Sequence, residues 1–336
     1  MHRIALNGLG RIGRATLKII LDTPELELVA INDIAPVGNL AYLLKYDTVY
    51  GHFGKSVEAG EGLLRIDGRE IPVLNEKDPT KLPWKEMDVD TVFECTGIFR
   101  TTEDLQKHIE AGATHAILSA PSKSEDMLTV VHGTSEDQRP ATYSCASCTT
   151  NGITPVFEVV ARRVGIRKAA MTTVHGYTTS QNIVDGPSKK LRRGRAGAAN
   201  LVPTTTGAAI ATTKVLPEFE GRFDGAAIRA PVPCGSIADL TFVMERATSV
   251  EEINGIFSEE SESERYRGIL GVTRDPLVSS DILRDPRATV VDLEMTKVID
   301  GDLLKVMSWY DNEWGYAAQM VREAVQLSKG QPREEG

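Results

Sequence analysis

Two cysteines lie three residues apart in the stretch YSCASCTTNG, residues 143–152, at positions Cys145 and Cys148. A pair at this spacing can bind a metal, form a redox-active disulfide, or contain one nucleophile beside an unreactive neighbour. A structural zinc site needs four ligands, and the chain offers neither a second CxxC pair nor two closely spaced histidines. A thioredoxin-like dithiol normally opens a helix after its first cysteine, in a much shorter fold. The pattern therefore favours a nucleophile, and it predicts no metal site.

Cys148 is the better candidate for that nucleophile. The segment CTTN is predicted to begin a helix, so Cys148 lies at a helix N-terminus, where N–H groups and the dipole stabilise a thiolate and lower its pKa. Of the six histidines only His175 follows Cys148, within the polar segment TTVHGYTTSQ. An imidazole can accept the thiol proton, so we predict that Cys148 and His175 form the catalytic pair.

Hydroxyl side chains gather around both candidates. Ser147, Thr149 and Thr150 flank the cysteine, Thr178 and Thr179 follow the histidine, and the segment TTTG supplies Thr204 to Gly207. Clusters of hydroxyl and backbone N–H groups suit phosphate oxygens, and Arg195 and Arg229 can add positive charge. The combination predicts a substrate that carries a phosphate group.

A glycine-rich turn near the N-terminus predicts a nucleotide site. GLGRIG places Gly8, Gly10 and Gly13 in the GxGxxG spacing between a strand and a helix. In this setting the first glycine permits a tight turn, the second lets a pyrophosphate approach, and the third allows close helix packing. Asp33 lies twenty residues beyond Gly13, where a carboxylate accepts ribose hydroxyls and repels the extra phosphate of NADP. We therefore expect NAD rather than NADP.

The bulk composition is that of an ordinary globular chain. The 336 residues include 41% hydrophobic and 25% charged residues, and no apolar run is long enough to span a bilayer. The N-terminus lacks the pattern of a signal peptide, so the expected location is cytoplasmic. The net charge of −9 argues against a nucleic-acid partner. One basic loop, with five Lys or Arg between 189 and 195, is interpreted as a solvated or interfacial segment.

The elements that position these residues change character near residue 150. Before it, short apolar runs at 3–7, 26–33, 90–97 and 115–120 alternate with helical patterns, which predicts a parallel sheet covered on both faces. After it, a predicted helix over 152–165 is followed by longer strands with polar or small residues at alternate positions, typical of an antiparallel sheet. A final helix is predicted over 312–327. The sequence thus predicts an α/β chain with two domains.

The same residues resemble the phosphorylating glyceraldehyde-3-phosphate dehydrogenase family over nearly the whole chain. The segments that carry the resemblance include NGLGRIGR, ECTGIF, SCASCTTN, TTVHGYTTSQ, TTTGAA and SWYDNEWGY. The resemblance implies a Rossmann-type doubly wound parallel sheet and an α+β catalytic domain with a mostly antiparallel sheet. It places the NAD-binding domain at 1–147, completed by a C-terminal helix at 313–336, and the catalytic domain at 148–312.

The resemblance also implies a reaction and a role for each site residue. Cys148 would attack an aldehyde, His175 would take its proton, a hydride would pass to NAD, and inorganic phosphate would release the acyl group from a thioester. Residues matching the family's substrate and phosphate sites are Ser147, Thr149, Thr178, Arg195, Thr206, Gly207 and Arg229. Residues matching its cofactor site are Gly8, Gly10, Arg11, Ile12, Gly13, Asp33, Thr96, Gly97, Ser119, Asn312 and Tyr316.

Some alternatives stay open from sequence alone. The family resemblance implies a homotetramer, in which the loop at 178–200 reaches a neighbouring subunit. A related activity is the oxidation of erythrose 4-phosphate, and a non-enzymatic alternative is a thiol redox sensor that pairs Cys145 with Cys148. The chain departs from the family at Cys145, Gly152 and Cys234, where other residues are common.

Overall fold

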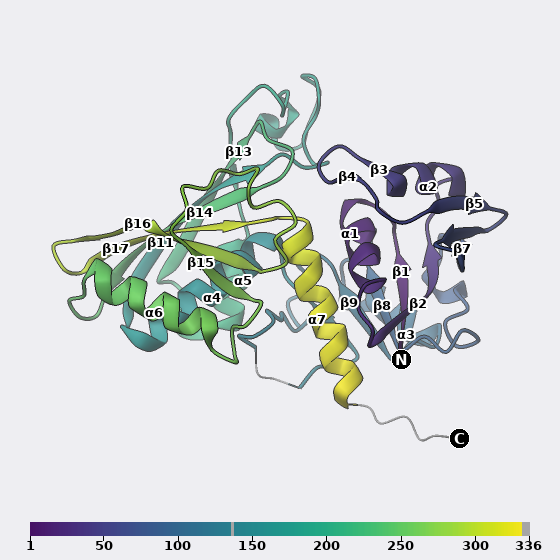
Figure 1. Cartoon of the computed structure of the whole chain (residues 1–336), viewed down its shortest axis with the longest axis horizontal. Coiled ribbons are helices and arrows are strands. Elements are labelled where there is room, and N and C mark those ends of the chain that lie inside the picture. Colours follow the sequence, from purple (N-terminus) through teal and green to yellow (C-terminus); the bar gives the residue numbers. More distant parts are fainter. Residues whose placement is uncertain (136–137, 331–336) are drawn as a thin grey trace. The chain divides into compact units, whose positions relative to one another are not determined.

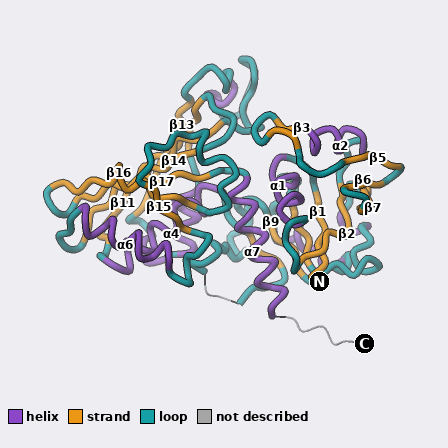
Figure 2. The backbone as a smooth tube through the Cα atoms, viewed as in Figure 1, coloured by secondary structure: helices purple, strands orange, loops and turns teal. Residues whose placement is uncertain are grey.

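The computed structural model describes residues 1–135 and 138–330, which form two compact units. The first contains residues 1–132, 138–146 and 320–330, and the second contains 133–135 and 147–319. Figure 1 shows both, coloured along the sequence, and Figure 2 separates helices, strands and loops. The C-terminal helix α7 (Trp314–Gly330) begins in the second unit and ends in the first; residues 331–336 of the predicted terminal helix lie outside the described part.

The first unit is built on one eight-stranded sheet. Its strand order is β10-β9-β8-β1-β2-β7-β6-β5, and pairing is parallel from β10 to β7. The hairpins that join β7, β6 and β5 are antiparallel, and the sequence patterns did not predict them. The strands are β1 (His2–Asn7), β2 (Leu26–Asn32), β5 (Val57–Gly60), β6 (Leu63–Ile66), β7 (Arg69–Leu74), β8 (Thr91–Glu94), β9 (His115–Leu118) and β10 (Thr142–Ser144).

Three helices accompany this sheet. They are α1 (Arg11–Ile20), α2 (Val37–Lys45) and α3 (Thr102–Glu110), and a short ribbon pairs β3 (Tyr46–Asp47) with β4 (Gly51–His52). Strands β1 and β8 are buried along almost their whole length, because parallel strands in such a sheet are covered on both faces. The strands predicted at 3–7, 26–33, 90–97 and 115–120 are therefore confirmed as β1, β2, β8 and β9.

The second unit is a seven-stranded sheet with helices on one face. Its order is β12-β13-β11-β14-β17-β16-β15, antiparallel except for the β11–β13 and β15–β16 pairs. The mixed α/β fold predicted from the sequence is thus confirmed. The strands are β11 (Ile166–Gly176), β12 (Val202–Thr205), β13 (Phe223–Ala230), β14 (Ser236–Met244), β15 (Leu270–Thr273), β16 (Thr289–Ile299) and β17 (Leu303–Tyr310).

Helices α4 (Cys148–Arg163), α5 (Ala208–Val215) and α6 (Val250–Glu262) cover one face of that sheet (Figure 1). Phe157 of α4 lies at the centre of the core, with its ring 4.7 to 5.3 Å from those of Phe219, Phe223 and Phe242. Residues on β14 alternate between buried and half-buried, as expected when only one face is covered. Burial of this aromatic group fixes α4, and with it Cys148, against the sheet.

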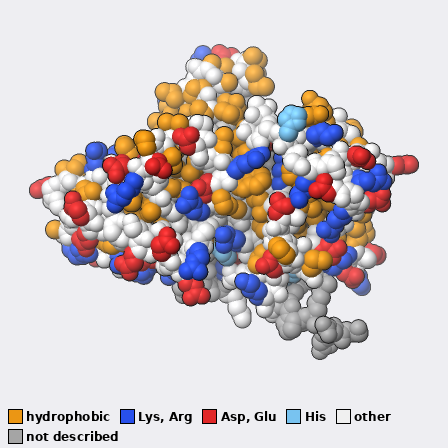
Figure 3. All heavy atoms as spheres, in the orientation of Figure 1, with side chains coloured by type: hydrophobic (Ala, Val, Ile, Leu, Met, Phe, Trp, Pro, Cys, Tyr) orange, Lys and Arg blue, Asp and Glu red, His pale blue; other side chains and the backbone are white. Residues whose placement is uncertain are grey.

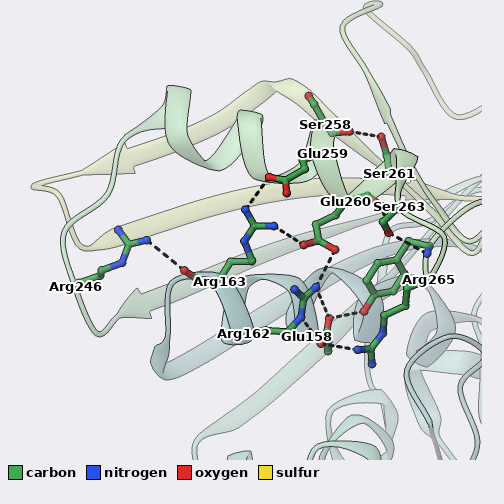
Figure 4. A network of polar contacts seen from close by, with 11 residues as sticks. Glu158, Arg162, Arg163, Arg246, Ser258, Glu259, Glu260, Ser261, Ser263 and Arg265 are labelled. Atoms are coloured by element: carbon green, nitrogen blue, oxygen red, sulfur yellow. Dashed lines mark hydrogen bonds and ion pairs between the residues drawn. The ribbon is translucent and has the colours of Figure 1, made fainter.

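A network of ion pairs anchors the far end of α4 to α6 (Figure 4). Glu260 is 6% exposed, and its carboxylate accepts hydrogen bonds from Arg162 at 2.8 Å and Arg163 at 2.6 Å. Glu158, one turn before Arg162, accepts from Arg162 at 2.9 Å and from the Tyr266 hydroxyl. Although burial opposes it, the arginine bonds hold the pKa of Glu260 below its ordinary value.

Replacing Glu260 with Gln is expected to lower the free energy of unfolding by about 2 kcal/mol at pH 7, since it removes charge-assisted bonds to two arginines. Because the folded-state pKa is lowered, this contribution is present above the ordinary carboxyl pKa and is lost as pH falls through the lowered value. Urea unfolding at several pH values measures both effects. Glu259→Gln is the matched control, because Glu259 pairs with the same Arg163 from an exposed position and should matter much less. Equal losses in the two variants would contradict this account.

Candidate functional site

Cys148 occupies the first position of α4. Ser147 is the N-cap residue: its backbone is extended, and its hydroxyl accepts the backbone N–H of Thr150 at 3.0 Å. The side-chain amide of Asn151 donates to the Ser147 carbonyl at 3.0 Å, which closes the first turn. This capping explains why the helix begins at Cys148, although the apolar pattern alone predicted its start at residue 152.

The structure brings the two predicted catalytic side chains together. Cys148 Sγ lies 3.3 Å from His175 Nε2, and His175 is 3% exposed near the end of β11. The ring of Tyr310 lies 6.0 Å from the imidazole, and its hydroxyl bonds to those of Thr149 at 3.0 Å and Thr173 at 2.8 Å. This packing holds the imidazole in place beside the sulfur.

Burial affects the charge of both members of this pair. It raises the pKa of the Cys148 thiol, against the opposing effects of the Arg229 charge and of the N–H and hydroxyl groups of Thr149. Burial and the Arg229 charge lower the pKa of His175 to about 3. The backbone N–H groups at the helix N-terminus act to lower the thiol pKa, as the sequence predicts, but desolvation of this half-buried thiol raises it by more. Burial therefore opposes charge on both members of the pair.

Of the residues predicted to bind phosphate, Arg229 contacts His175 directly. It lies opposite His175 in the parallel pairing of β11 with β13. Its Nη1 is 2.5 Å from His175 Nδ1 and 2.9 Å from the Gly176 carbonyl oxygen. Its Nε is buried without a hydrogen-bond partner, and no acidic side chain of the described residues pairs with it. A half-buried guanidinium with an unpaired Nε is a natural site for an anion.

The other substrate-site candidates lie on loops and at helix ends of the same unit. Arg195 is exposed and pairs with Asp185 at 2.8 Å, and the Thr178 hydroxyl bonds to that of Ser180 at 2.9 Å. Thr206 and Gly207 directly precede α5, and the Thr206 hydroxyl accepts the N–H of Ala208 at 3.1 Å. Within the described residues, none of these groups is hydrogen-bonded to Cys148, His175 or Arg229.

Sequence reasoning missed a basic residue that organises the loop between β11 and β12. Arg193 Nε donates to the Thr204 hydroxyl at 3.0 Å, and Lys190 Nζ lies 3.0 Å from the Thr205 hydroxyl. The charge of Arg193 also contributes to the lowered pKa values of His175 and Arg229. The basic residues between 189 and 195 indicated the loop in the sequence, but they did not show that Arg193 is the one that turns inward.

Two cofactor-site candidates belong to the catalytic unit. Asn312 Oδ1 accepts hydrogen bonds from the Gly235 N–H at 3.1 Å and the Ser236 hydroxyl at 2.9 Å, which leaves its amide N–H₂ group to point away from these donors. Tyr316 is buried in α7. Ser236 was not a sequence candidate, since a lone serine in a strand carries no signal of its own.

Cys234, one of the departures from the family pattern, has a structural role beside Asn312. It is buried, and its thiol lies 3.2 Å from Asp311 Oδ1, to which it donates. The same Asp311 oxygen accepts the backbone N–H groups of Glu313 and Trp314 at 2.8 Å each. The cysteine therefore belongs to the hydrogen bonds that open α7.

The glycine turn of the first unit has the shape that a dinucleotide requires. Gly8 has φ = +94°, and a Cβ on Gly13 would lie 2.1 Å from the Gly8 carbonyl oxygen. A Cβ on Gly10 would meet no atom within 4 Å. Gly10 is the N-cap of α1, whose first turn has neither a side-chain cap nor an acidic residue. The turn thus offers open space and uncapped N–H groups to a pyrophosphate, so these residues fit the predicted cofactor.

The remaining cofactor candidates of this unit lie in α1 or directly after strands of the sheet. Asp33 Oδ2 accepts the N–H of Leu9 at 2.7 Å, so the carboxylate is fixed beside the glycine turn. Arg11 Nη1 donates to Asp47 Oδ2 at 2.5 Å. Ile12 is half-buried in α1; Thr96, Gly97 and Ser119 follow β8 and β9.

A buried glutamate that the sequence did not single out supports Thr96. Glu94 is fully buried at the end of β8, and its Oε1 accepts both the N–H of Thr96, at 2.8 Å, and the Thr96 hydroxyl. Its Oε2 accepts from Asn7 at 2.5 Å and lies 3.2 Å from His108 Nε2. The only available signal was a glutamate ending the apolar run TVFE. These bonds fix the segment on which the glycine turn rests.

Substitutions at Gly13 and Gly10 are expected to differ in their effects on stability and on NAD binding. Gly13→Ala is expected to lower the free energy of unfolding by roughly 3 kcal/mol, because the added methyl group meets a backbone oxygen that cannot move freely. Gly10→Ala should leave unfolding nearly unchanged and weaken NAD binding about tenfold or more, because its methyl group enters the predicted pyrophosphate space. Thermal unfolding without NAD and calorimetric titration with NAD measure the two effects. If a Gly10→Ala variant binds NAD normally, the pyrophosphate does not bind at this turn.

Cys145 lies in the first unit and is 3% exposed. Burial and the nearby Glu323 carboxylate raise its pKa well above the ordinary value, although Arg139 acts in the opposite direction. All four cysteines are free thiols. A buried thiol that stays protonated is a poor partner in disulfide exchange, which favours a packing role for Cys145.

Neither a metal-binding cluster nor a membrane-spanning helix is found among residues 1–135 and 138–330. In the ranges 1–135 and 138–330, no cluster of three or more His, Cys, Asp or Glu side chains is arranged to hold a metal ion. Across those same ranges, no helix has the length and hydropathy needed to cross a bilayer.

Comparison with known proteins identifies the family. Residues 2–102 match the model of the glyceraldehyde 3-phosphate dehydrogenase NAD binding domain, and residues 147–312 match that of its C-terminal domain. The enzyme named glyceraldehyde-3-phosphate dehydrogenase from Thermotoga maritima is 49% identical over 326 residues, covering 96% of this chain and 97% of its own. Those of Streptomyces coelicolor and Haloarcula vallismortis are each 45% identical, covering 95% and 97% of this chain and 96% and 98% of their own. The chain therefore belongs to the glyceraldehyde-3-phosphate dehydrogenase family of NAD-dependent enzymes.

Proposed function

We propose that this enzyme oxidises D-glyceraldehyde 3-phosphate with NAD and inorganic phosphate to 1,3-bisphosphoglycerate. The observation that carries the proposal is the distance of 3.3 Å between Cys148 Sγ and His175 Nε2 at the start of α4. A thiol in contact with an imidazole at a helix N-terminus is equipped to attack a carbonyl carbon. The family membership supports the choice of substrate and cofactor.

The first step joins Cys148 to the aldehyde. The thiol sulfur forms a bond to the carbonyl carbon, and its proton moves to His175 Nε2. His175 then gives this proton to the carbonyl oxygen, which completes a hemithioacetal and leaves the imidazole neutral. Because burial raises the thiol pKa, removal of the proton by a positioned base matters for the rate. The backbone N–H groups at the start of α4 stabilise negative charge on the attacking sulfur.

The second step converts the hemithioacetal into a thioester on Cys148. NAD, when bound, supplies the acceptor for the hydride that leaves the former aldehyde carbon. His175 accepts the proton of the hemithioacetal hydroxyl as the C=O bond forms. Phosphate then attacks the thioester carbon, the C–S bond breaks, and the cysteine sulfur leaves and is reprotonated. Asn312, fixed by Gly235 and Ser236, orients the nicotinamide carboxamide in this proposal.

Two groups of residues hold the phosphates in this scheme. Arg229 and Thr178 bind the C3 phosphate of the substrate, and the buried unpaired Nε of Arg229 supports this role. Ser147, Thr149, Thr206, Gly207 and Arg195 are proposed to form the site of the attacking phosphate. The exposed pairing of Arg195 with Asp185 leaves that guanidinium able to exchange partners at low cost.

An assay matrix tests the proposed reaction against its nearest alternative. Purified enzyme is given glyceraldehyde 3-phosphate or erythrose 4-phosphate, NAD or NADP, with and without inorganic phosphate, and NADH or NADPH formation is followed. We expect the fastest turnover with glyceraldehyde 3-phosphate, NAD and phosphate together. Faster oxidation of erythrose 4-phosphate that needs no phosphate would instead assign the alternative activity.

We also propose that the enzyme is a homotetramer. The sheet of the second unit has helices on one face only, and its other face carries half-buried residues that include Ile237, Val243, Met307 and Trp309. The loop at 178–200 exposes Ile183, Val184 and Leu191 by 86%, 73% and 85%, and hydrophobic side chains gather on the upper projection in Figure 3. Apolar surface of this kind favours burial against another subunit. Light scattering on the purified protein should give four times the chain mass of 36.6 kDa, and a monomer would refute the assembly.

A further inference from the structure

A pocket of about 450 Å³ lies between helix α6 and strand β16. Small-molecule sites in proteins commonly have volumes of this size. All the residues that line the pocket belong to the second unit, and none of them was predicted to bind substrate, phosphate or NAD. Figure 1 shows α6 packed beside β15 and β16 at one edge of the sheet. The pocket therefore shares no residue with the site around Cys148.

The pocket lies where the pairing of β16 is irregular. The register between β16 and β17 breaks between Asp292 and Lys297, so residues 293–296 lie opposite Val306 alone. The edge strand β15 pairs with β16 only as far as Asp292. A bulge of this kind redirects side chains, and bulges are frequent beside functional sites. Most of the bulged segment lines the pocket, so strand pairing is interrupted at the place where the pocket opens.

The wall that α6 gives to the pocket is polar and carries a glycine. Glu251, Asn254, Gly255 and Ser258 line the pocket, and their spacing places them on one face of the helix. A Cβ on Gly255 would meet no atom within 4 Å, so no neighbouring segment requires a glycine there. Glycine inside a helix is destabilising relative to alanine. The missing side chain of Gly255 instead leaves room in the pocket.

Two buried polar atoms of the pocket wall, Asn254 Oδ1 and Thr296 Oγ1, have no hydrogen-bond partner among residues 1–135 and 138–330. Asn254 is 8% exposed and Thr296 is 5% exposed. The side-chain amide nitrogen of Asn254 donates to the Leu293 carbonyl at 2.9 Å, which fixes Oδ1 as the free atom because a carbonyl only accepts. An unpaired buried oxygen is unfavourable until a donor reaches it. The interior of the pocket therefore suits a ligand that donates hydrogen bonds.

The opening of the pocket carries more negative than positive charge. Its exposed charged side chains are Glu251, Glu294 and Arg274, and Arg274 Nη1 lies 3.4 Å from Glu294 Oε1. Two carboxylates beside one guanidinium favour a cation. An ammonium group is a cation with three hydrogen-bond donors and no acceptor, so it matches both the opening and the interior. Val250 and Leu293, which also line the pocket, suit the methylene groups of such a ligand.

We propose that this pocket binds a linear aliphatic amine with two or more ammonium groups. One ammonium group lies inside and donates to Asn254 Oδ1 and Thr296 Oγ1, and a second lies at the opening beside Glu251 and Glu294. The methylene chain between them fills the space beside Gly255. Binding stabilises the folded protein, because the site exists only when α6 and β16 are in place. The site is independent of the proposed reaction, since it contains none of the residues that carry that reaction.

Calorimetric titration of the full-length wild-type enzyme with 1,4-diaminobutane tests the site. We expect saturable binding with a dissociation constant of about 1 mM or tighter. Under the same conditions 1,4-butanediol, which has the same length but no charge, should bind at least about tenfold more weakly. Succinate, which carries negative charge at both ends, should not bind. Absence of diamine binding, or equal binding of the diol or of succinate, would overturn the proposal.

Gly255→Ala places a methyl group in the pocket. It should weaken the binding of 1,4-diaminobutane at least about tenfold, because the added group occupies the space of the methylene chain. In the ligand-free protein it should raise the unfolding temperature by about 2 °C, because alanine favours a helix. The two changes have opposite signs, so loss of binding cannot be ascribed to a damaged fold. Normal binding by this variant would show that the diamine lies elsewhere, which contradicts the proposal.

Thr296→Val tests the hydrogen bond inside the pocket. It removes a hydroxyl group that has no partner in the described part of the chain, so the free energy of unfolding should not fall. Binding of 1,4-diaminobutane should weaken about fivefold. Thr289→Val is the matched control, since Thr289 is also a buried threonine of β16 whose hydroxyl has no partner among the described residues, but it does not line the pocket. Equal weakening in the two variants, or weakening in neither, would refute this placement of the ammonium group.

Discussion

Cys148→Ser is expected to lower kcat for glyceraldehyde 3-phosphate by at least about 10⁴-fold while NAD affinity changes little. A serine hydroxyl remains protonated at neutral pH and is a much weaker nucleophile than sulfur, so neither the hemithioacetal nor the thioester should form. NAD binding is retained because its glycine turn lies in the first unit, far along the chain from Cys148. Single-turnover NADH formation and calorimetric titration with NAD measure the two quantities.

Cys145→Ser is the control for this substitution. The buried Cys145 is not expected to take part in the reaction, so its replacement should keep most of the activity and affect mainly stability. After peroxide treatment, thiol counting on this variant should match that of the wild-type enzyme. If Cys145→Ser no longer recovers its activity after peroxide treatment, the redox-sensor alternative is favoured. If Cys148→Ser is active, Cys148 is not the nucleophile.

His175→Asn is expected to lower kcat by roughly 10³-fold, because it removes the group that accepts the thiol proton. KM for glyceraldehyde 3-phosphate should change less, since His175 does not bind the phosphate in the proposed scheme. With the imidazole gone, the reaction depends on the thiolate already present, and the raised pKa of Cys148 makes that fraction grow with pH. The activity of the variant should therefore increase more steeply with pH than that of the wild type.

The measurement is a pH series of single-turnover rates for both enzymes. His175→Gln is a useful companion, because its longer side chain tests whether a neutral amide near the sulfur recovers any activity. A His175→Asn variant with normal kcat and a raised KM would show that the imidazole binds substrate rather than moving a proton.

Local patterns were sufficient for the parts of the site that depend on neighbouring residues. The glycine turn, the start of the helix at Cys148 and the buried strands β1 and β8 follow from spacing and residue type within a few positions. The polar setting of His175 singled it out, and the structure confirms its contact with Cys148. These predictions succeed because the physical causes, such as a left-handed turn or a helix cap, are local.

The sequence did not predict contacts between residues that lie far apart along the chain. The register that sets Arg229 opposite His175 joins two parallel strands separated by a long connection, and no local pattern encodes it. The burial of Glu94 and the raised pKa of Cys148 likewise depend on what other segments contribute around them. The antiparallel β5–β7 edge was missed because its short strands read as turns and loops.

The anchoring of α4 at its far end gives the enzyme a mechanical property. The helix spans sixteen residues, or about 24 Å, with the reactive sulfur at one end and the arginines that grip Glu260 at the other. Because α4 is held at its C-terminal end, greater mobility at that end also moves its N-terminal end, where Cys148 lies. Selection for catalysis in the cold should therefore enrich mutations at Arg162, Arg163 and Glu260, well away from the chemistry they adjust.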